Sequence, residues 1–417
     1  MLVTTQDAWT TEIGLHLGRN GGRVHWAAGL TESNFLGLGK EVGFQYDDGV
    51  ERTNRSLEFS DPALLGPYWS GAALYEDNSD GSRRRVRVAK PFVSPADRLA
   101  AEALWDRQQL EERIYAGGEV ASEYARRHQR VRARWGTALA ASPLRADRLT
   151  LSVDFFQDDF RNLAGRPEDP LPQARDFRYF LVGWERVSSD FVSTDYIDRA
   201  ERVEDFNLGL QLAVEGGVSP KGFGAPSTTF AAAGRASQGW RVGPSAFVLA
   251  GVSFQTRLDG GVQNGVLSGS VRLAWKHRGR PLQTTVARLA FDRGWNLDRD
   301  VQFFADGDHG LRGYRLYAFE GDRRIVVNLE HRFFGGFQVL QLFSLGAAVF
   351  VDTGAAVPPG TPLAWSSFKT DAGAGLRLGI ARAASNTVLR LDCAYAFDPD
   401  PQGRRGWLVS FSSGQGF

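Results

Sequence analysis

The chain has 417 residues, and its 49 lysines and arginines nearly balance its 48 aspartates and glutamates, which leaves a formal net charge of +1. This balance gives no indication of a nucleic-acid partner, and the one cysteine, Cys393, excludes an intrachain disulfide. No apolar stretch approaches the roughly 18 residues that a transmembrane helix needs, since the longest runs only from Leu342 to Val351. The 48 glycines and the mean hydropathy of −0.28 fit a membrane barrel and a soluble β-protein equally well.

The first residues do not form a signal peptide, because neither a basic segment nor a sufficient apolar segment follows Met1. Met1 is also the only methionine, which suits an added initiator. If the protein is exported, we therefore expect this chain to be a fragment of a longer protein or to have lost its original start.

Alternating side chains predict an all-β chain of many strands joined by turns. The first strand covers residues 9–18, where Ile13, Leu15 and Leu17 share one face. Residues 23–31 are expected to form the next strand, which runs back beside the first. A tight turn then follows at Asn34, Phe35, Leu36 and Gly37.

Residues 97–142 allow two interpretations. The stretch Leu99–Ile114 is rich in good helix formers and could be an amphipathic helix. It could also be one arm of a long hairpin that turns at Gly117-Gly118 and projects beyond a membrane, and we favour the hairpin. The basic run Arg126–Arg134 alternates with apolar residues, which is typical of a polar strand face rather than of a nucleic-acid site.

Regular spacing continues through the middle of the chain, and no domain linker or repeat interrupts it, so residues 1–417 are predicted to form a single domain. The expected strands cover residues 147–161, 174–192, 205–216, 228–241, 245–258, 263–277 and 282–293. We count about fifteen strands before residue 312 and about five after it, up to about twenty in all.

The stretch Gly307–Arg332 carries the most specific motifs. A glycine-rich loop contains Leu311, Arg312, Gly313 and Tyr314. The strand after it places Ile325, Val327 and Leu329 on one face, and its other face carries Asn328, Glu330 and Arg332. Residues 338–354 form the next strand, which ends in a motif containing Phe350, Asp352 and Gly354.

These three motifs, in this order, resemble those of the C-terminal barrel of the BamA/TamA superfamily of outer-membrane proteins, the bacterial surface antigen type. The resemblance implies a transmembrane antiparallel β-barrel of sixteen strands in the outer membrane of a Gram-negative-type bacterium. It also implies that the loop folds into the lumen, where Arg312 meets Glu330 and Asp352. A guanidinium can bind carboxylates through paired hydrogen bonds, so we expect these residues to act as a latch on the loop.

The resemblance extends to both ends of the chain. The Asn34–Gly37 turn is similar to a periplasmic turn of the family. The last strand, residues 405–417, resembles the C-terminal signal that outer-membrane barrels present to their assembly machinery, and the residues that carry this signal and the proposed weak seam are Trp407, Phe411, Gly414, Gly416 and Phe417. Glycine weakens a strand, so we expect the last strand to pair poorly with the first.

Sequence signatures of enzymes, cofactor sites and metal sites are absent, so we expect a protein that is not an enzyme and that needs no cofactor. The loop residues Asp306, Asp308 and His309 crowd together, but they lack the ligand spacing of a calcium loop. We expect them to be solvated.

The family resemblance implies an assembly or translocation factor that inserts proteins into the outer membrane, or passes them across it, through a seam between its first and last strands. Two alternatives stay open: a translocator like those of two-partner secretion, and a stand-alone pore or structural barrel. The implied partners are outer-membrane lipids and lipopolysaccharide, unfolded outer-membrane or exported proteins, and periplasmic accessory proteins. The periplasmic POTRA repeats of assembly factors are not visible in this sequence.

Overall fold

The structure is a computed structural model that describes residues 9–415, except for residues 201, 278, 280–281, 340–342 and 381–387. Gly416, Phe417 and the first eight residues therefore lie outside the described part of the chain. Within the described ranges, no helix is long and apolar enough to cross a membrane.

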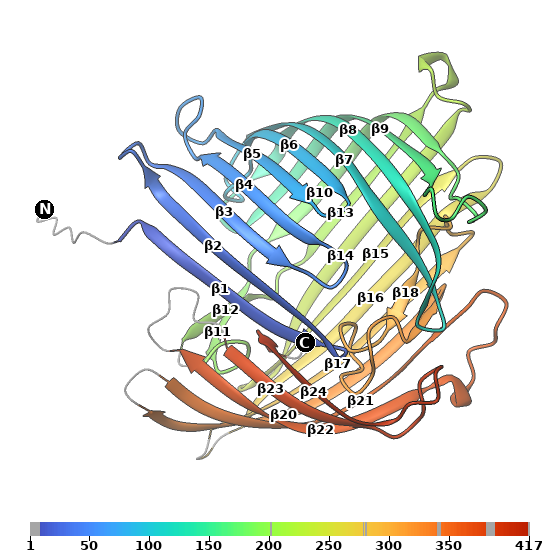
Figure 1. Ribbon diagram of the computed structural model, residues 1–417. Helices are drawn as coiled ribbons and strands as arrows, with labels where there is room; N and C mark the ends of the chain where they lie inside the picture. The colour runs from blue at the N-terminus through green and yellow to red at the C-terminus, as the bar shows by residue number, and fades with distance from the viewer. Residues whose placement is uncertain are drawn as a thin grey trace, which may run out of the picture.

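The described residues form a closed antiparallel β-barrel of twenty strands, in which each strand pairs with its neighbour along the chain and β24 returns to β1 (Figure 1). The barrel strands are β1 (Thr11–Asn20), β2 (Arg23–Phe35), β3 (Lys40–Asp48), β4 (Thr53–Asp61), β5 (Ser70–Asn78), β6 (Gly81–Lys90), β7 (Leu99–Ala116), β8 (Glu119–Ala141), β9 (Arg145–Asn162), β10 (Arg175–Ser188), β13 (Gln211–Ser219), β14 (Thr229–Gly243), β15 (Ala246–Leu258), β16 (Val262–His277), β17 (Leu282–Trp295), β20 (Arg323–Val339), β21 (Phe343–Val357), β22 (Lys369–Ile380), β23 (Val388–Ala396) and β24 (Gly406–Ser413). Two small hairpins lie in the connections: β11 (Phe191–Asp195) with β12 (Val203–Asn207), and β18 (Phe303–Ala305) with β19 (Phe319–Gly321). Two single-turn 3-10 helices complete the described elements, η1 (Lys221–Phe223) and η2 (Trp365–Ser367).

The strand count from the sequence is confirmed, because fifteen barrel strands precede Arg312 and five follow it in the described chain. The sixteen strands that the family resemblance implies are therefore too few. One predicted strand, residues 205–216, was wrong: the structure divides it between β12 and β13. The β11–β12 hairpin was not predicted.

The alternation of the strands divides the side chains between an apolar outer surface and a polar interior. Val86, Trp105, Val131 and Phe155 stand next to one another across β6 to β9, and each keeps at least a third of its surface exposed on the outside of the barrel. Charged side chains of the opposite parity, such as Arg83, Asp106 and Asp154, point inward. This distribution is the one expected of a barrel that meets lipid outside and water inside.

The two rims of the barrel differ. The turn rim, where β1 begins and β24 ends, has short connections such as residues 36–39, 142–144 and 244–245, and one long connection, residues 189–210, which holds β11 and β12. The loop rim, at the other end of the strands, has tight turns such as residues 79–80 and 117–118, but it also holds more of the long connections, residues 163–174, 296–322 and 358–368. Outer-membrane barrels have short periplasmic turns and longer extracellular loops, so this asymmetry is the one expected if the loop rim faces outward.

Residues 97–142 form the predicted hairpin rather than a helix. β7 and β8 pair along almost their whole length and turn at Gly117 and Gly118, which both have positive φ. The tip of this hairpin reaches the long connection that holds β18 and β19 (Figure 1).

Candidate functional site: a buried charge cluster in the barrel lumen

The connection between β17 and β20 is folded around the buried carboxylate of Asp306. This carboxylate accepts hydrogen bonds from the backbone N–H groups of Asp308 (2.9 Å), His309 (3.0 Å) and Tyr317 (2.6 Å). The ring of His309 lies 2.7 Å from the same carboxylate. The expectation that these residues are solvated was therefore wrong for Asp306, which is fully buried and organises the loop. Within the described ranges, no cluster of three or more potential ligands could hold a metal ion.

Arg312, at the tip of this loop, is buried against the inner wall with 3% of its surface exposed. Its Nε and Nη2 donate to the two oxygens of Asp352 at 2.7 Å and 3.0 Å, which is a bidentate pair. Its Nη1 donates to Glu330 and, at 3.4 Å, to Asp392. The guanidinium also lies 3.4 Å from the centre of the Phe350 ring. The structure thus brings together the three residues of the predicted latch.

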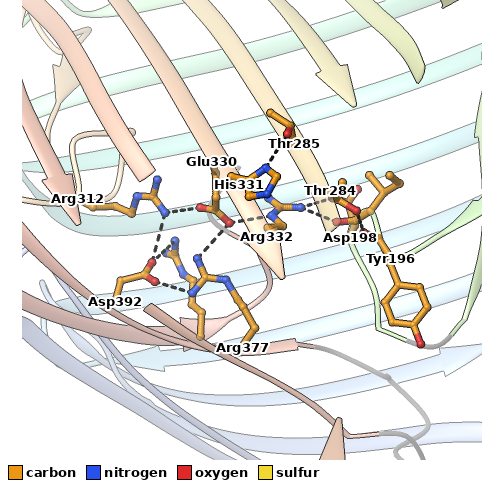
Figure 2. A network of polar contacts seen from close by, with 12 residues as sticks. Tyr196, Asp198, Thr284, Thr285, Arg312, Glu330, His331, Arg332, Arg377 and Asp392 are labelled. Atoms are coloured by element: carbon orange, nitrogen blue, oxygen red, sulfur yellow. Dashed lines mark hydrogen bonds and ion pairs between the residues drawn. The ribbon is translucent and has the colours of Figure 1, made fainter. Parts of the chain in front are cut away.

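The wall beneath Arg312 is formed by inward-facing positions of four consecutive strands, β20 to β23. Glu330 also accepts hydrogen bonds from Arg332 at 2.8 Å and from Arg377 at 3.1 Å (Figure 2). Arg377 also donates a hydrogen bond from Nη1 to Asp392. Asn328 donates from Nδ2 to Asp352 at 2.8 Å. We call the following eight side chains the luminal cluster: Arg312, Arg332, Arg377, Arg390, Glu330, Asp352, Asp371 and Asp392.

The luminal cluster contains as many arginines as carboxylates, so their formal charges cancel. Seven of its members are at most 3% exposed, and the side chain of Arg390 is 11% exposed. Burial of an unpaired charge costs several kcal/mol, so the ion pairs of Arg312, Glu330, Asp352 and Asp392 are needed for the cluster to be stable. Asp371 belongs to the cluster by its position opposite Asp352 in the register.

Apolar residues of the loop pack beside the cluster. Leu311 and Tyr314 belong to a buried group that includes Val326 and Ala396, and the Tyr314 hydroxyl donates to the Thr370 carbonyl at 3.1 Å. Two glycines of the motifs allow close packing. A Cβ at Gly313 would lie 2.6 Å from the Cβ of Asp371, and a Cβ at Gly354 would lie 2.7 Å from the Ile325 carbonyl oxygen.

A second segment enters the lumen from the turn rim. It is the β11–β12 hairpin, whose connecting residues Ile197 and Asp198 lie beside Arg332 (Figure 2). Arg332 Nη1 donates to the Ile197 carbonyl, and Arg272 donates to Asp198 at 2.9 Å. The Glu330–Arg332 pair therefore links this segment to the Arg312 loop, so segments from opposite rims meet in one network.

The tip of the β7–β8 hairpin is bound to the outer side of the Arg312 loop. The backbone of Tyr115 and the side chain of Gln302 exchange two hydrogen bonds of 2.9 Å and 2.7 Å. The rings of Tyr115 and Tyr317 are stacked with centroids 3.8 Å apart, and both hydroxyls donate to Glu51. The loop is therefore held between the wall of the barrel and this hairpin.

The loop environment shifts the pKa of three loop side chains. Burial opposes the charge of Arg312, but Asp352, Glu330 and Asp392 outweigh it and raise the pKa above its ordinary value. The hydrogen bond from the His309 ring to the Asp306 carboxylate raises the pKa of His309. Burial, together with the neighbouring Glu51, raises the pKa of Tyr317. Arg312 therefore stays charged in the loop.

The remaining predicted residues lie outside the cluster. The Asn34–Gly37 turn is at the turn rim, where the Gly37 N–H donates to the Asn34 carbonyl at 2.8 Å and Leu36 has a φ of 55°. Trp407 and Phe411 lie on β24, and Gly414 follows this strand with a φ of 91°.

The contact between the first and last strands is short. In the described residues the β1–β24 register contains one pair, Arg19 with Phe411, whereas every other neighbouring pair of barrel strands shares at least eight. One side-chain contact, 3.4 Å between Ser413 and His16, accompanies it. We call this junction the seam.

The sequence matches no protein-family profile and no curated protein. Among solved structures it is similar to BamA from Haemophilus ducreyi lacking POTRA domains 1-3, at 13% identity and a TM-score of 0.44, over 98% of this chain and 71% of that one. It is also similar to CdiB from Acinetobacter baumannii, at 10% identity and a TM-score of 0.47, over 98% of this chain and 60% of that one. CdiB from Escherichia coli matches at 13% identity and a TM-score of 0.44, over 99% of this chain and 63% of that one. The chain thus spans less than two thirds of each CdiB chain.

Proposed function

We propose that this chain is the barrel of an outer-membrane assembly or translocation factor, and that it acts on unfolded proteins through the seam between β1 and β24. The observation that carries the proposal is the single register pair that the described part of the seam contains, Arg19 with Phe411. A closed barrel removes the unpaired strand edges that would bind other chains. A barrel closed by so few backbone pairs can expose such an edge at low cost.

An open seam would offer the unpaired N–H and C=O groups of β1 to an incoming strand, which would add to the sheet by hydrogen bonding. This step needs neither a nucleotide nor covalent chemistry, because the incoming chain gains hydrogen bonds as it pairs. The substrates would be unfolded outer-membrane or exported proteins, which accessory proteins in the periplasm would deliver.

In this proposal the luminal cluster is a latch that fixes the Arg312 loop inside the barrel. The loop also reaches the seam side of the barrel. Leu316 donates its backbone N–H to the Gly21 carbonyl at 3.4 Å, and Asn20 donates to Asp308 at 3.0 Å, so the loop supports the turn between β1 and β2. A loop that is held in place would keep the end of β1 in position while the rest of its edge is free.

A disulfide across the seam tests the proposal. Cysteines at Arg19 and Phe411, in a Cys393→Ser background, would occupy the registered pair of the described seam residues, and directly opposed residues of antiparallel strands meet the Cα distance of a disulfide. In lipid vesicles, the oxidised protein should no longer accelerate the folding of a urea-denatured outer-membrane barrel, and reduction should restore the activity. The control is a disulfide between Thr31→Cys and Gly43→Cys, a registered pair of β2 and β3, which should have no effect.

The second candidate is a translocator that passes an exported chain through the lumen. The inner wall at β14 to β16 favours this second candidate, because it carries small polar side chains. Ser237, Ser253 and Ser270 are among the residues that line a cavity of about 390 Å³ at this wall. The same disulfide separates the two candidates. Transport that survives seam oxidation would contradict the seam mechanism and support the luminal route.

A further inference from the structure

The outer surface of the barrel carries a cluster of three arginines near the loop rim. Arg84 on β6 and Arg107 on β7 stand directly opposite one another in the register. Arg127 on β8 stands opposite Gln109, and is therefore a diagonal neighbour of Arg107. All three side chains are exposed. We call them the outer arginine cluster.

These arginines have acids nearby, with Asp77 diagonal to Arg84 in the register, but they differ from the inward-facing arginines of the same strands, which form ion pairs. Arg83 and Arg85 point into the lumen and bind Asp106 at 2.8 Å and 2.7 Å. Among the described residues, no member of the outer arginine cluster forms an ion pair, although Asp159 stands opposite Arg127 in the register. Like charges directly opposite one another destabilise a sheet, so an anion that bridges Arg84 and Arg107 would remove an unfavourable interaction.

The position of the cluster indicates where that anion lies. Trp105 is two residues from Arg107 on the same outward face, and it belongs to the apolar row that runs across β6 to β9. The Arg84 guanidinium lies 5.6 Å from the centre of the Tyr75 ring, which is also exposed. Aromatic residues mark the membrane–water interface of barrels. The three arginines therefore lie at headgroup depth, on the loop-rim side of the apolar surface.

We propose that the outer arginine cluster binds the phosphate groups of anionic lipid headgroups in the leaflet at the loop rim. A guanidinium matches the geometry of a phosphate and can donate two parallel hydrogen bonds to it. Facing arginines on adjacent strands can share one phosphate, and the diagonal Arg127 can contact a second one on the same headgroup. This inference rests on the proposed membrane location of the barrel, but it does not depend on the proposed action on unfolded proteins.

Lipid binding to the purified barrel can be measured by native mass spectrometry with bisphosphorylated lipid A, dephosphorylated lipid A and inorganic phosphate as separate probes. We expect the barrel to prefer the bisphosphorylated lipid, and the variant Arg84→Gln/Arg107→Gln to lose about tenfold or more of that affinity. The control variant Arg55→Gln/Arg145→Gln removes the same amount of charge from exposed positions that face or contact an acid, Asp77 and Asp147 respectively. It should bind like the wild type.

Equal affinity of the wild type and Arg84→Gln/Arg107→Gln for bisphosphorylated lipid A would overturn the proposal, as would equal affinity for the lipid with and without its phosphates. Inorganic phosphate that binds as tightly as the lipid would show a free-phosphate site and overturn the lipid assignment. Heat-dependent migration in gels verifies that each variant is folded before it is compared. Because binding is measured without any protein substrate, a failure of the proposed translocation activity would leave this result unchanged.

Discussion

The variant Arg312→Ala tests the latch. It removes one of the four arginines of the luminal cluster and leaves all four carboxylates in place. Asp352 loses both hydrogen bonds of its bidentate pair and keeps the one from Asn328 at 2.8 Å. Glu330 keeps Arg332 and Arg377. The main consequence is therefore an uncompensated charge at Asp352, which is fully buried.

Loss of one partner from a buried ion pair costs about 3–5 kcal/mol. We expect a loss of this size for Arg312→Ala, confined to the loop and its contacts, because the backbone hydrogen bonds of the barrel do not involve Arg312. Arg312→Lys should cost less, because it keeps the charge but loses the two parallel hydrogen bonds. Asp352→Asn in the Arg312→Ala background should recover part of the loss, because it removes the stranded charge.

Two measurements test these expectations. Guanidinium unfolding from lipid vesicles gives the free energy, and chymotrypsin cleavage after Tyr314, which is buried in the docked loop, reports whether the loop has left the wall. Planar bilayers should show a leakier lumen for Arg312→Ala. A cost below about 1 kcal/mol, the level of an exposed ion pair, together with wild-type protection from chymotrypsin would refute the latch.

The charge-reversed double variant, Arg312→Asp with Asp352→Arg, should recover less of the lost stability than the sequence motifs alone predict. The structure places Glu330 and Asp392 beside Arg312 as well, so a carboxylate at this position would meet two others. Recovery by the reversed pair should therefore be smaller than recovery by Asp352→Asn. A reversed pair that recovers fully would show that Asp352 is the only functional partner.

Three further predictions concern the loop. Tyr115→Ala should release the tip of the β7–β8 hairpin by removing its stacked ring, and faster hydrogen exchange of residues 110–122 with an unchanged barrel would show it. Gly313→Ala should displace the loop, because its Cβ would lie 2.6 Å from the Cβ of Asp371, and chymotrypsin sensitivity close to that of Arg312→Ala is expected. The hydrogen bond from the His309 ring to the Asp306 carboxylate raises the pKa of His309, so the stabilisation that this bond gives is fully present below the ordinary histidine pKa and is lost as the pH rises through the raised value. Protease protection of the loop should accordingly fall with rising pH through neutrality, and His309→Ala should flatten the profile.

Part of the site could be predicted because strands have a period of two. Glu330 and Asp352 carry the parity of the inward face of their strands, and the glycines around Arg312 permit a close approach to that wall. The same rule applied to the following strands would have found Arg377 and Asp392, which also face inward. They were missed because neither lies in a recognisable motif.

The sequence by itself determined the all-β architecture, a count of about twenty strands and the apolar face of the most regular strands, and it favoured the β7–β8 hairpin, because all of these follow from local alternation and turn residues. Only the tertiary structure decided which inward side chains meet. The contact of Tyr115 with Gln302 and that of Arg332 with Ile197 join residues that are 187 and 135 positions apart. Such contacts depend on the register of every strand between them and on the closure of the barrel, and no local pattern encodes the sum of those registers. The pairing of Arg312 with Glu330 and Asp352 could be predicted from the sequence motifs. The network that joins these residues to other strands exists only because the barrel closes around them.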